Sequence, residues 1–522
     1  MPLEPGPLPN GCVEYVPNLR YIDPVMRSRS CRLSANTASF GLRWIALSLR
    51  VLLVACLTVI MTTCVNPVWL EHSTYAAPAA LRPANFDSDL QWNMEMINAP
   101  GAWGIMESLV TNGTTLHPVV VAVLDTRVAE HDDLVSQLLD ELNIVDDNGG
   151  NVGPGIPDNQ HGTHVSGIIA AAGDPSGDGL IGVAGSFVSL LPVRVLDLEG
   201  QGTTGDLTRG IWAAVEYLET VGAMRVINLS LGGGSTDAAL YDAIAYARGR
   251  GVTIIAAGGN SGEEGLLVPA FFDNTIAVTA VTATGSRASY SNFGSGVSLA
   301  APGGAGYYSD QPLDSPGTTA WDAVLSTWET DKYRWLSGTS MATPHVAGIA
   351  ALLYAVEPGL NQDAVYSILR ATARDLGTPG WDKYYGHGLV DAQAALEYLL
   401  NLQQRIPRAP MGADDSGAAG GISIQTSALS GAQYPEAESD IDSHSVILRF
   451  HEGQAPVTGP ELFRFEARLR QRFGVASAQR IGAHTMVVKL GAGQQPLDML
   501  EPLAALDEVQ YSQPNYRYQA IR

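Results

Sequence analysis

The sequence predicts a large α/β domain, a three-layer sandwich around a mostly parallel sheet, followed by a small α+β domain. Two observations lead to this prediction. Between residues 85 and 402, short apolar runs alternate with helix-like stretches, which is typical of a parallel sheet covered on both faces. In residues 445–522, strand-like and helix-like segments follow one another in the order β-α-β-β-α-β. The chain of 522 residues is long enough for both domains.

The elements expected in the large domain are apolar strands with helices between them. The strands are Val119–Leu124, Leu190–Leu196, Arg225–Leu229, Val252–Ala257 and Thr275–Val281. The helices are His164–Ala172, Asp206–Leu218, Asp237–Gly249, Thr343–Ala355 and Asn361–Ala373. Residues 403–444 lose this pattern and are rich in Gly, Ala, Ser, Asp and Glu, which indicates a flexible acidic linker.

The small domain contains four short strands and two helices. The strands are Ser445–Phe450, Ala478–Ile481, Thr485–Leu490 and Val509–Tyr511. The helices are Gly459–Arg472 and Pro496–Leu506. Their order is that of a ferredoxin-like domain.

Charge and cysteine content exclude several function classes. The net charge of −23 argues against a nucleic-acid-binding protein, which needs a basic face. All four cysteines lie before residue 65, so the rest of the chain has neither disulfides nor a cysteine-based zinc site.

Residues 1–84 form an N-terminal extension that contains an export-type segment. A hydrophobic core at about residues 44–61 follows several arginines, as in a signal peptide or a membrane anchor. Cys56 ends a lipobox-like sequence, and Cys64 is a second candidate for lipidation. We favour a plain signal peptide, and therefore a secreted or extracytoplasmic protein that contacts a membrane only if the anchor is retained.

The segment Leu336–Gly348 places a serine among small residues. Gly338 permits a tight turn and a close approach to a bound substrate. Pro344 suits the first turn of a helix, so Ser340 is expected at a buried helix N-terminus, where developing negative charge is favoured. An ordinary helix cap would explain the same residues.

Three further segments carry polar residues in positions suited to chemistry. Asp125 follows an apolar strand, His161 precedes a helix of small residues, and Asn260 lies in a glycine-rich loop after another strand. Each has a second explanation. Asp125 suits a turn, and His161 with His164 suggests a metal pair, without the Glu of a zinc-protease motif. The loop suggests phosphate binding, without the P-loop lysine.

Taken in the order Asp, His, Asn, Ser, these motifs resemble those of the subtilisin-like serine proteases, the subtilases, over residues 85–400. The resemblance implies that Ser340 attacks a peptide carbonyl and that His161 transfers its proton. It implies that Asp125 orients the imidazole, and that Asn260 with the backbone N–H of Ser340 holds the oxyanion. Subtilisin is itself a standard example of this chemistry. No cofactor is required for it.

The resemblance also implies a cleft that binds protein or peptide substrates as extended strands. The residues matching its walls are Ser230, Leu231, Gly232, Gly233, Ala257, Gly258 and Gly259. Small residues leave the pocket open to large apolar side chains. Glu263 and Glu264 either add a preference for basic residues or are solvated loop charges.

Two features set this chain apart from the usual pattern or extend it. Arg127 stands where the family usually has glycine, and a position that needs positive φ would strain it. The acidic loop containing Asp146, Asp147 and Asp158 is consistent either with structural calcium or with a solvated loop.

The tail Val509–Tyr518 looks like the end of a subtilase propeptide. With the β-α-β-β-α-β order before it, the C-terminal domain, residues 445–522, resembles that inhibitory propeptide, which normally precedes the protease. We therefore expect the chain's own C-terminal domain to act as an intramolecular inhibitor and chaperone. An unrelated ferredoxin-like appendage is the other explanation. The function expected of the whole chain is a secreted serine endopeptidase that works through an acyl-enzyme. The alternative is a catalytically impaired binding protein on a subtilase scaffold.

Overall fold

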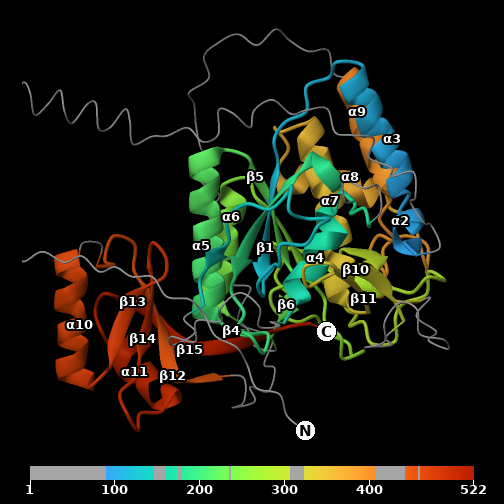
Figure 1. The fold of residues 1–522 in the computed structure, drawn as a ribbon. Helices are drawn as coiled ribbons and strands as arrows, with labels where there is room; N and C mark the ends of the chain where they lie inside the picture. The colour runs from blue at the N-terminus through green and yellow to red at the C-terminus, as the bar shows by residue number, and fades with distance from the viewer. Residues whose placement is uncertain are drawn as a thin grey trace, which may run out of the picture. The chain divides into compact units, whose positions relative to one another are not determined.

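A parallel sheet forms the centre of the large domain (Figure 1). The computed structural model describes residues 90–145, 159–173, 179–233, 237–305, 322–405, 441–456 and 459–521. Seven strands lie in the order β2-β3-β1-β5-β7-β8-β9, and all adjacent pairs are parallel. They are β1 (Val120–Asp125), β2 (Leu142–Asn143), β3 (Ser189–Arg194), β5 (Met224–Leu229), β7 (Thr253–Ala257), β8 (Ile276–Val281) and β9 (Leu299–Pro302).

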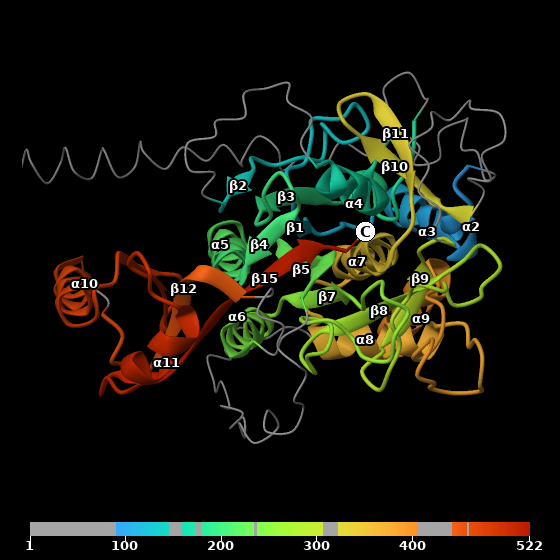
Figure 2. The ribbon, with the colours of Figure 1, turned by 90° about the horizontal axis from the view of Figure 1, so that it is seen from below.

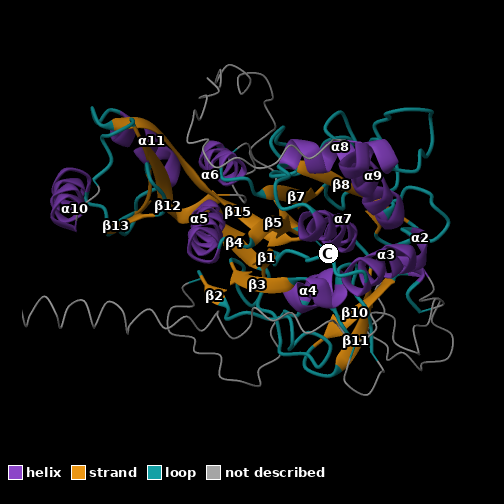
Figure 3. Ribbon diagram, turned by 90° about the horizontal axis from the view of Figure 1, so that it is seen from above, coloured by secondary structure: helices purple, strands orange, loops and turns teal. Residues whose placement is uncertain are grey.

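Helices cover both faces of this sheet, which confirms the predicted fold class (Figure 3). Helices α5 (Thr204–Val221) and α6 (Ala238–Gly249) pack on one face. The other face is covered by α3 (Ala99–Thr111), α4 (His161–Ala170), α7 (Thr339–Val356), α8 (Gln362–Thr372) and α9 (Ala392–Arg405). Successive side chains of β1 therefore pack on opposite faces of the sheet. Val121 and Val123 belong to the core on the α7 side, and Ala122 and Leu124 to the core on the α5 side.

Helix α7 is the central helix of the domain. It alone among the helices of the described ranges is long and apolar enough to cross a membrane, yet 94% of it is buried inside the protein. Its composition therefore reflects a core helix. The expected hydrophobic segment at residues 44–61, with Cys56 and Cys64, lies outside the described residues.

Several elements of the large domain were not predicted. They are α2 (Trp92–Met96), α3, β2, η1 (Gly185–Phe187), β4 (Gln201–Thr203), β9, α9 and the antiparallel hairpin of β10 (Val324–Trp328) and β11 (Lys332–Leu336). The short strand β6 (Leu231–Gly232) lies within Ser230–Gly233, which the resemblance matches to a strand. One expectation was wrong. Pro344 lies inside α7 rather than in its first turn, because the helix already begins at Thr339.

The small domain has the predicted order of elements. They are β12 (Ile441–Phe450), α10 (Gly459–Phe473), β13 (Ser477–Arg480), β14 (Thr485–Lys489), α11 (Pro496–Ala504) and β15 (Val509–Ala520). Strands β13, β14, β12 and β15 form an antiparallel sheet, and both helices pack against its apolar core.

Strand β15 is much longer than the predicted Val509–Tyr511, and its second half leaves the small domain. It runs alongside the large domain towards α7 (Figure 2). There it pairs antiparallel with β4 through Arg517–Gln519 and with β6 through Gln519 and Ala520. The small domain also contacts α6, where Ile447 and Ile481 cluster with Ala239.

Candidate active site

Asp125 and His161 meet at the carboxyl edge of the parallel sheet. Asp125 is the last residue of β1 and His161 the first residue of α4. The Nδ1 atom of His161 lies 2.8 and 2.9 Å from the two carboxylate oxygens of Asp125. Both side chains are almost fully buried. Because a carboxylate only accepts hydrogen bonds, this contact leaves Nε2 of the neutral imidazole as the proton acceptor.

Arg127 lies in the turn that follows Asp125, and it does not strain that turn. Among the described non-glycine residues, positive φ occurs at Asn98 and Glu329, so Arg127 keeps an ordinary backbone conformation. Its side chain is half-exposed and pairs with Glu141 at 3.3 Å. The turn packs closely on α4, since a Cβ atom on Gly162 would lie 2.6 Å from the Thr126 carbonyl oxygen.

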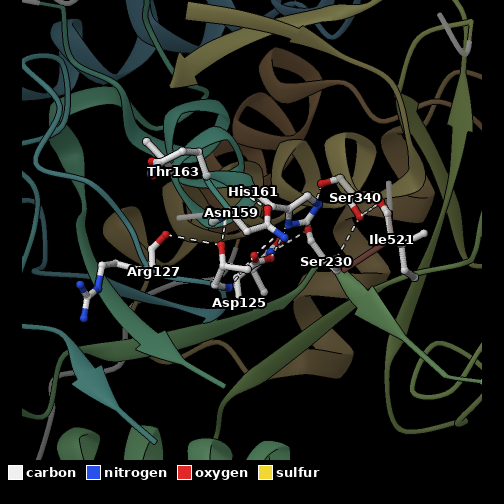
Figure 4. Close-up of polar contacts among 12 residues, drawn as sticks. Asp125, Arg127, Asn159, His161, Thr163, Ser230, Ser340 and Ile521 are labelled. Carbon is white, nitrogen blue, oxygen red and sulfur yellow. Dashed lines mark hydrogen bonds and ion pairs between the residues drawn. The ribbon is translucent and has the colours of Figure 1, made fainter. Parts of the chain in front are cut away.

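Ser340 lies in the first turn of α7, beside the imidazole of His161 (Figure 4). Nε2 of His161 is buried and has no hydrogen-bond partner in the described part of the chain. The hydroxyl of Ser340 is within hydrogen-bonding distance of two carbonyl oxygens, those of Ser230 at 2.9 Å and of Ile521. The single O–H donates to one of these oxygens at a time. The carbonyl of Ile521, the residue that follows β15, thus lies next to the Ser340 hydroxyl.

Pro344 leaves one backbone carbonyl of α7 without its helical hydrogen bond, and the Ser230 hydroxyl supplies another donor. Proline has no N–H, so the carbonyl of Ser340, four residues earlier, receives no helical hydrogen bond from it. The Ser230 hydroxyl donates to this carbonyl at 2.9 Å and accepts from Asn228 Nδ2 at 3.0 Å. The strand that lines the cleft is thereby tied to the helix that carries Ser340.

Asn260 presents its amide nitrogen to the same place. Its Oδ1 accepts from the backbone N–H and the hydroxyl of Thr339, both at 2.9 Å, which fixes the orientation of the amide. Its Nδ2 is buried without a partner in the described residues. A Cβ atom on Gly338 would lie 3.0 Å from this nitrogen and 3.2 Å from the Ile521 carbonyl oxygen. A side chain at position 338 would therefore crowd both groups.

The residues expected to bind substrate lie against the C-terminal segment beside Ser340, and so does one residue that was missed. The backbone of Ser230 accepts from the Ile521 N–H at 3.3 Å, and β6 contains Leu231 and Gly232. A Cβ atom on Gly233 would lie 2.8 Å from the Arg517 carbonyl oxygen. Gly200, which accepts from the Ala520 N–H at 2.9 Å, was not predicted, although the Gly-x-Gly at 200–202 after an apolar strand is a usable signal.

The other expected wall of the cleft follows β7. Ala257 ends that strand, and Gly258 and Gly259 continue from it. Gly259 has φ of 119°, a conformation that favours glycine, and its N–H donates to Thr339 Oγ1 at 3.1 Å. Glu264 is exposed and pairs with Lys383 at 3.0 Å.

His164 lies in the same helix as His161 but has a different environment. It is buried, and its Nε2 lies 2.9 Å from the Arg334 carbonyl oxygen. Burial lowers the pKa of His164 to about 3. Within the described ranges, no group of three or more His, Cys, Asp or Glu side chains is placed to hold a metal ion. The candidate calcium ligands Asp146, Asp147 and Asp158 lie outside the described residues.

A serine peptidase of the α/β class is the kind of protein that this fold and site define. Residues 117–388 match the family model described as the subtilase family. Subtilisin BL from Lederbergia lenta is 37% identical over 309 residues, covering 58% of this chain and 97% of that protein. Thermitase from Thermoactinomyces vulgaris is 35% identical over 314 residues, covering 60% and 97%. The chain belongs to the subtilase family.

Among solved structures, a protease from Pseudoalteromonas arctica has 32% identity and a TM-score of 0.49. The similarity covers 62% of this chain and all of that one. The relatives and the family match establish a subtilisin-like serine protease.

Proposed function

We propose that the protein is a secreted serine endopeptidase in which Ser340 is the nucleophile, His161 the general base and then acid, and Asp125 the orienting carboxylate. The His161 Nε2 atom takes the Ser340 proton as the hydroxyl oxygen attacks a substrate carbonyl, and later returns it to the leaving amine. The amide of Asn260 and the Ser340 N–H stabilise the oxyanion, since both donors are fixed before the reaction. The export-type segment at residues 44–61 supports secretion.

One observation carries this proposal, namely that an extended strand ends with its carbonyl at Ser340. Strand β15 adds between β4 and β6, and the Ile521 carbonyl accepts from the Ser340 hydroxyl. A substrate bound as an added strand would present its scissile carbonyl in the same way. The Ile521 side chain is 5% exposed, so the neighbouring pocket accepts a branched apolar group.

The test compares digestion of labelled casein by the full-length protein and by Ser340→Ala. We expect the variant to lose activity by several orders of magnitude, as removal of a triad member does. Ser166→Ala is the matched control, because Ser166 is an equally buried serine in α4 whose hydroxyl has no partner among the described residues. Equal activity of Ser340→Ala and the control would contradict the assignment. No activity in any folded form would favour the impaired binding protein.

We also propose that the C-terminal domain is an intramolecular inhibitor and folding chaperone of the protease. It is supported by contacts of the small domain that lie before the segment of β15 paired with β4 and β6. The Asn515 and Gln513 side chains accept from the first-turn N–H groups of Gly205 in α5, at 2.9 Å, and Ala239 in α6, at 3.3 Å. These helix ends need acceptors, and the domain supplies them. Arg449 adds an ion pair with Asp242 at 3.1 Å.

The inhibitor role is tested with Ala520→Pro. The substitution removes the N–H that donates to Gly200, so the strand should leave the cleft more often and hydrolysis of a small peptide should rise. Phe463→Ala is the control, because Phe463 lies on α10 and is 73% exposed. An unchanged rate in Ala520→Pro, with the protein folded, would contradict inhibition by this strand.

A further inference from the structure

A second feature of the docked strand concerns the side chain of Tyr518, three residues before Ile521. Tyr518 is 2% exposed, and its hydroxyl donates to Oδ2 of Asp237 at 2.8 Å. If β15 lies as a substrate does, which rests on the proposed function, Tyr518 occupies the subsite for the fourth residue before the cleaved bond. A buried carboxylate is an unusual partner for a substrate side chain, since buried Asp residues are rare unless they are paired.

Asp237 is buried, and groups of the large domain hold it in place. It is the N-cap residue of α6, and its Oδ1 accepts from the Leu240 N–H at 2.9 Å. The Thr204 hydroxyl, at the start of α5, donates to its Oδ2. Asp237 is 1% exposed, and burial raises its pKa. The carboxylate thus belongs to the large domain. Strand β15 adds a second contact to it, because Gln513 Nε2 donates to Oδ1 at 2.9 Å.

The pocket has room for a tyrosine ring because one wall is glycine. A Cβ atom on Gly233 would lie 3.0 Å from Cδ1 and 3.1 Å from Cε1 of Tyr518. On the α5 side, Thr204 donates its hydroxyl to Asp237. The ring packs on glycine, and the phenol reaches the carboxylate.

We propose that Asp237 makes this subsite selective for tyrosine, so that the protease prefers substrates with a phenol at the fourth residue before the cleaved bond. A phenylalanine there would bury the same ring but remove one of the two hydrogen bonds that Oδ2 of the carboxylate accepts. Sites built around a buried polar group reject analogues that lack the matching group. A hydrogen bond to a charged group predicts a preference for tyrosine over phenylalanine of about 10-fold to 100-fold.

The first test uses the full-length protein and two chromogenic peptides based on its own strand. They are acyl-Tyr-Gln-Ala-Ile-p-nitroanilide and its Phe counterpart. The readout is the ratio of their kcat/KM values. Occupancy of the cleft by β15 lowers both values by the same factor and cancels from the ratio. We expect a ratio of at least about 10 for the unmodified protein and of about 1 for Asp237→Ser.

Serine keeps the N-cap of α6, which limits damage to the fold. Asn361→Ser is the matched control, because Asn361 caps α8 in the same way, accepting from the Ala364 N–H at 2.9 Å, and has no part in the cleft. The control should keep the ratio of the unmodified protein. A ratio near 1 without any substitution, or a high ratio retained in Asp237→Ser, would overturn the proposal.

A second test does not depend on catalysis. In full-length Ser340→Ala protein, hydrogen exchange of the Ala520 amide reports how often the strand leaves the cleft. Tyr518→Phe should speed this exchange by about 10-fold or more, and should add little once Asp237→Ser is present. The absence of this coupling would overturn the role of Asp237. Coupling without hydrolysis of either peptide would preserve the pocket and reject the proposed endopeptidase.

Discussion

Removing the hydroxyl of Ser230 should destabilise the protein through the helix that carries Ser340. The Ser230 hydroxyl joins Asn228 Nδ2 and the Ser340 carbonyl at 3.0 and 2.9 Å, and all three residues are fully buried. In Ser230→Ala the carbonyl is left without a donor, because Pro344 cannot provide one. A buried polar group that loses its partner costs about 1–3 kcal/mol, and that is the expected loss in the free energy of unfolding.

The measurement is urea unfolding, made in Ser340→Ala protein so that self-digestion does not intervene. The same series includes Pro344→Ala, which restores an N–H four residues after the orphaned carbonyl. The double variant Ser230→Ala/Pro344→Ala should recover a large part of the loss caused by Ser230→Ala alone. If Ser230→Ala causes the same loss whether or not Pro344→Ala is also present, the link between the two residues is refuted.

Three further predictions concern acid stability, calcium and processing. Burial lowers the His164 pKa from 6.5 to about 3. Below pH 6.5 the unfolded state therefore binds a proton that the folded state does not, and the stability that neutral His164 gives above pH 6.5 is lost on acidification. At about 1.4 kcal/mol per pH unit this amounts to about 2 kcal/mol between pH 6.5 and 5, measured as the difference in urea stability from His164→Gln. If Asp146, Asp147 and Asp158 bind calcium, a chelator should lower the melting temperature and added calcium should restore it; identical melting curves would reject the site. Because the Ile521 carbonyl lies at Ser340, intact-mass analysis should show chains ending at Ile521 in active protein but not in Ser340→Ala.

Local patterns were enough to predict the parallel sheet and the βαββαβ order of the small domain. Both depend on runs of apolar residues with a period that short windows reveal. The segments bearing Asp125, His161, Asn260 and Ser340 were also found, because each stands at a strand end or a helix start. The register of β15 against β4 and β6 was not predictable from such windows, since it joins segments about 300 residues apart.

Asp237 shows the same limit more sharply. As an N-cap before α6 it has an ordinary local explanation, and its sequence neighbours say nothing of Tyr518, 281 residues away. Pro344 was misplaced for the opposite reason. Local preference favours proline in a first turn, whereas here the Ser230 hydroxyl compensates for a proline inside the helix. Tertiary contacts overrode a sound local rule.

Inhibitor and substrate would use the same backbone groups in this cleft, so a difference in their occupancy of the cleft must come from other contacts. The backbone hydrogen bonds of Gly200 and Ser230 serve any extended strand. Gln513 and Asn515 contact the first turns of α6 and α5, and Gln513 also donates to Asp237 at 2.9 Å. A peptide with four residues before the cleaved bond has no counterpart to them. These contacts, together with covalent attachment to the same chain, raise the occupancy of the cleft without any change in the subsites. The selectivity of the site is therefore set by Asp237 and its neighbours, whereas its availability is set by the anchors of the small domain.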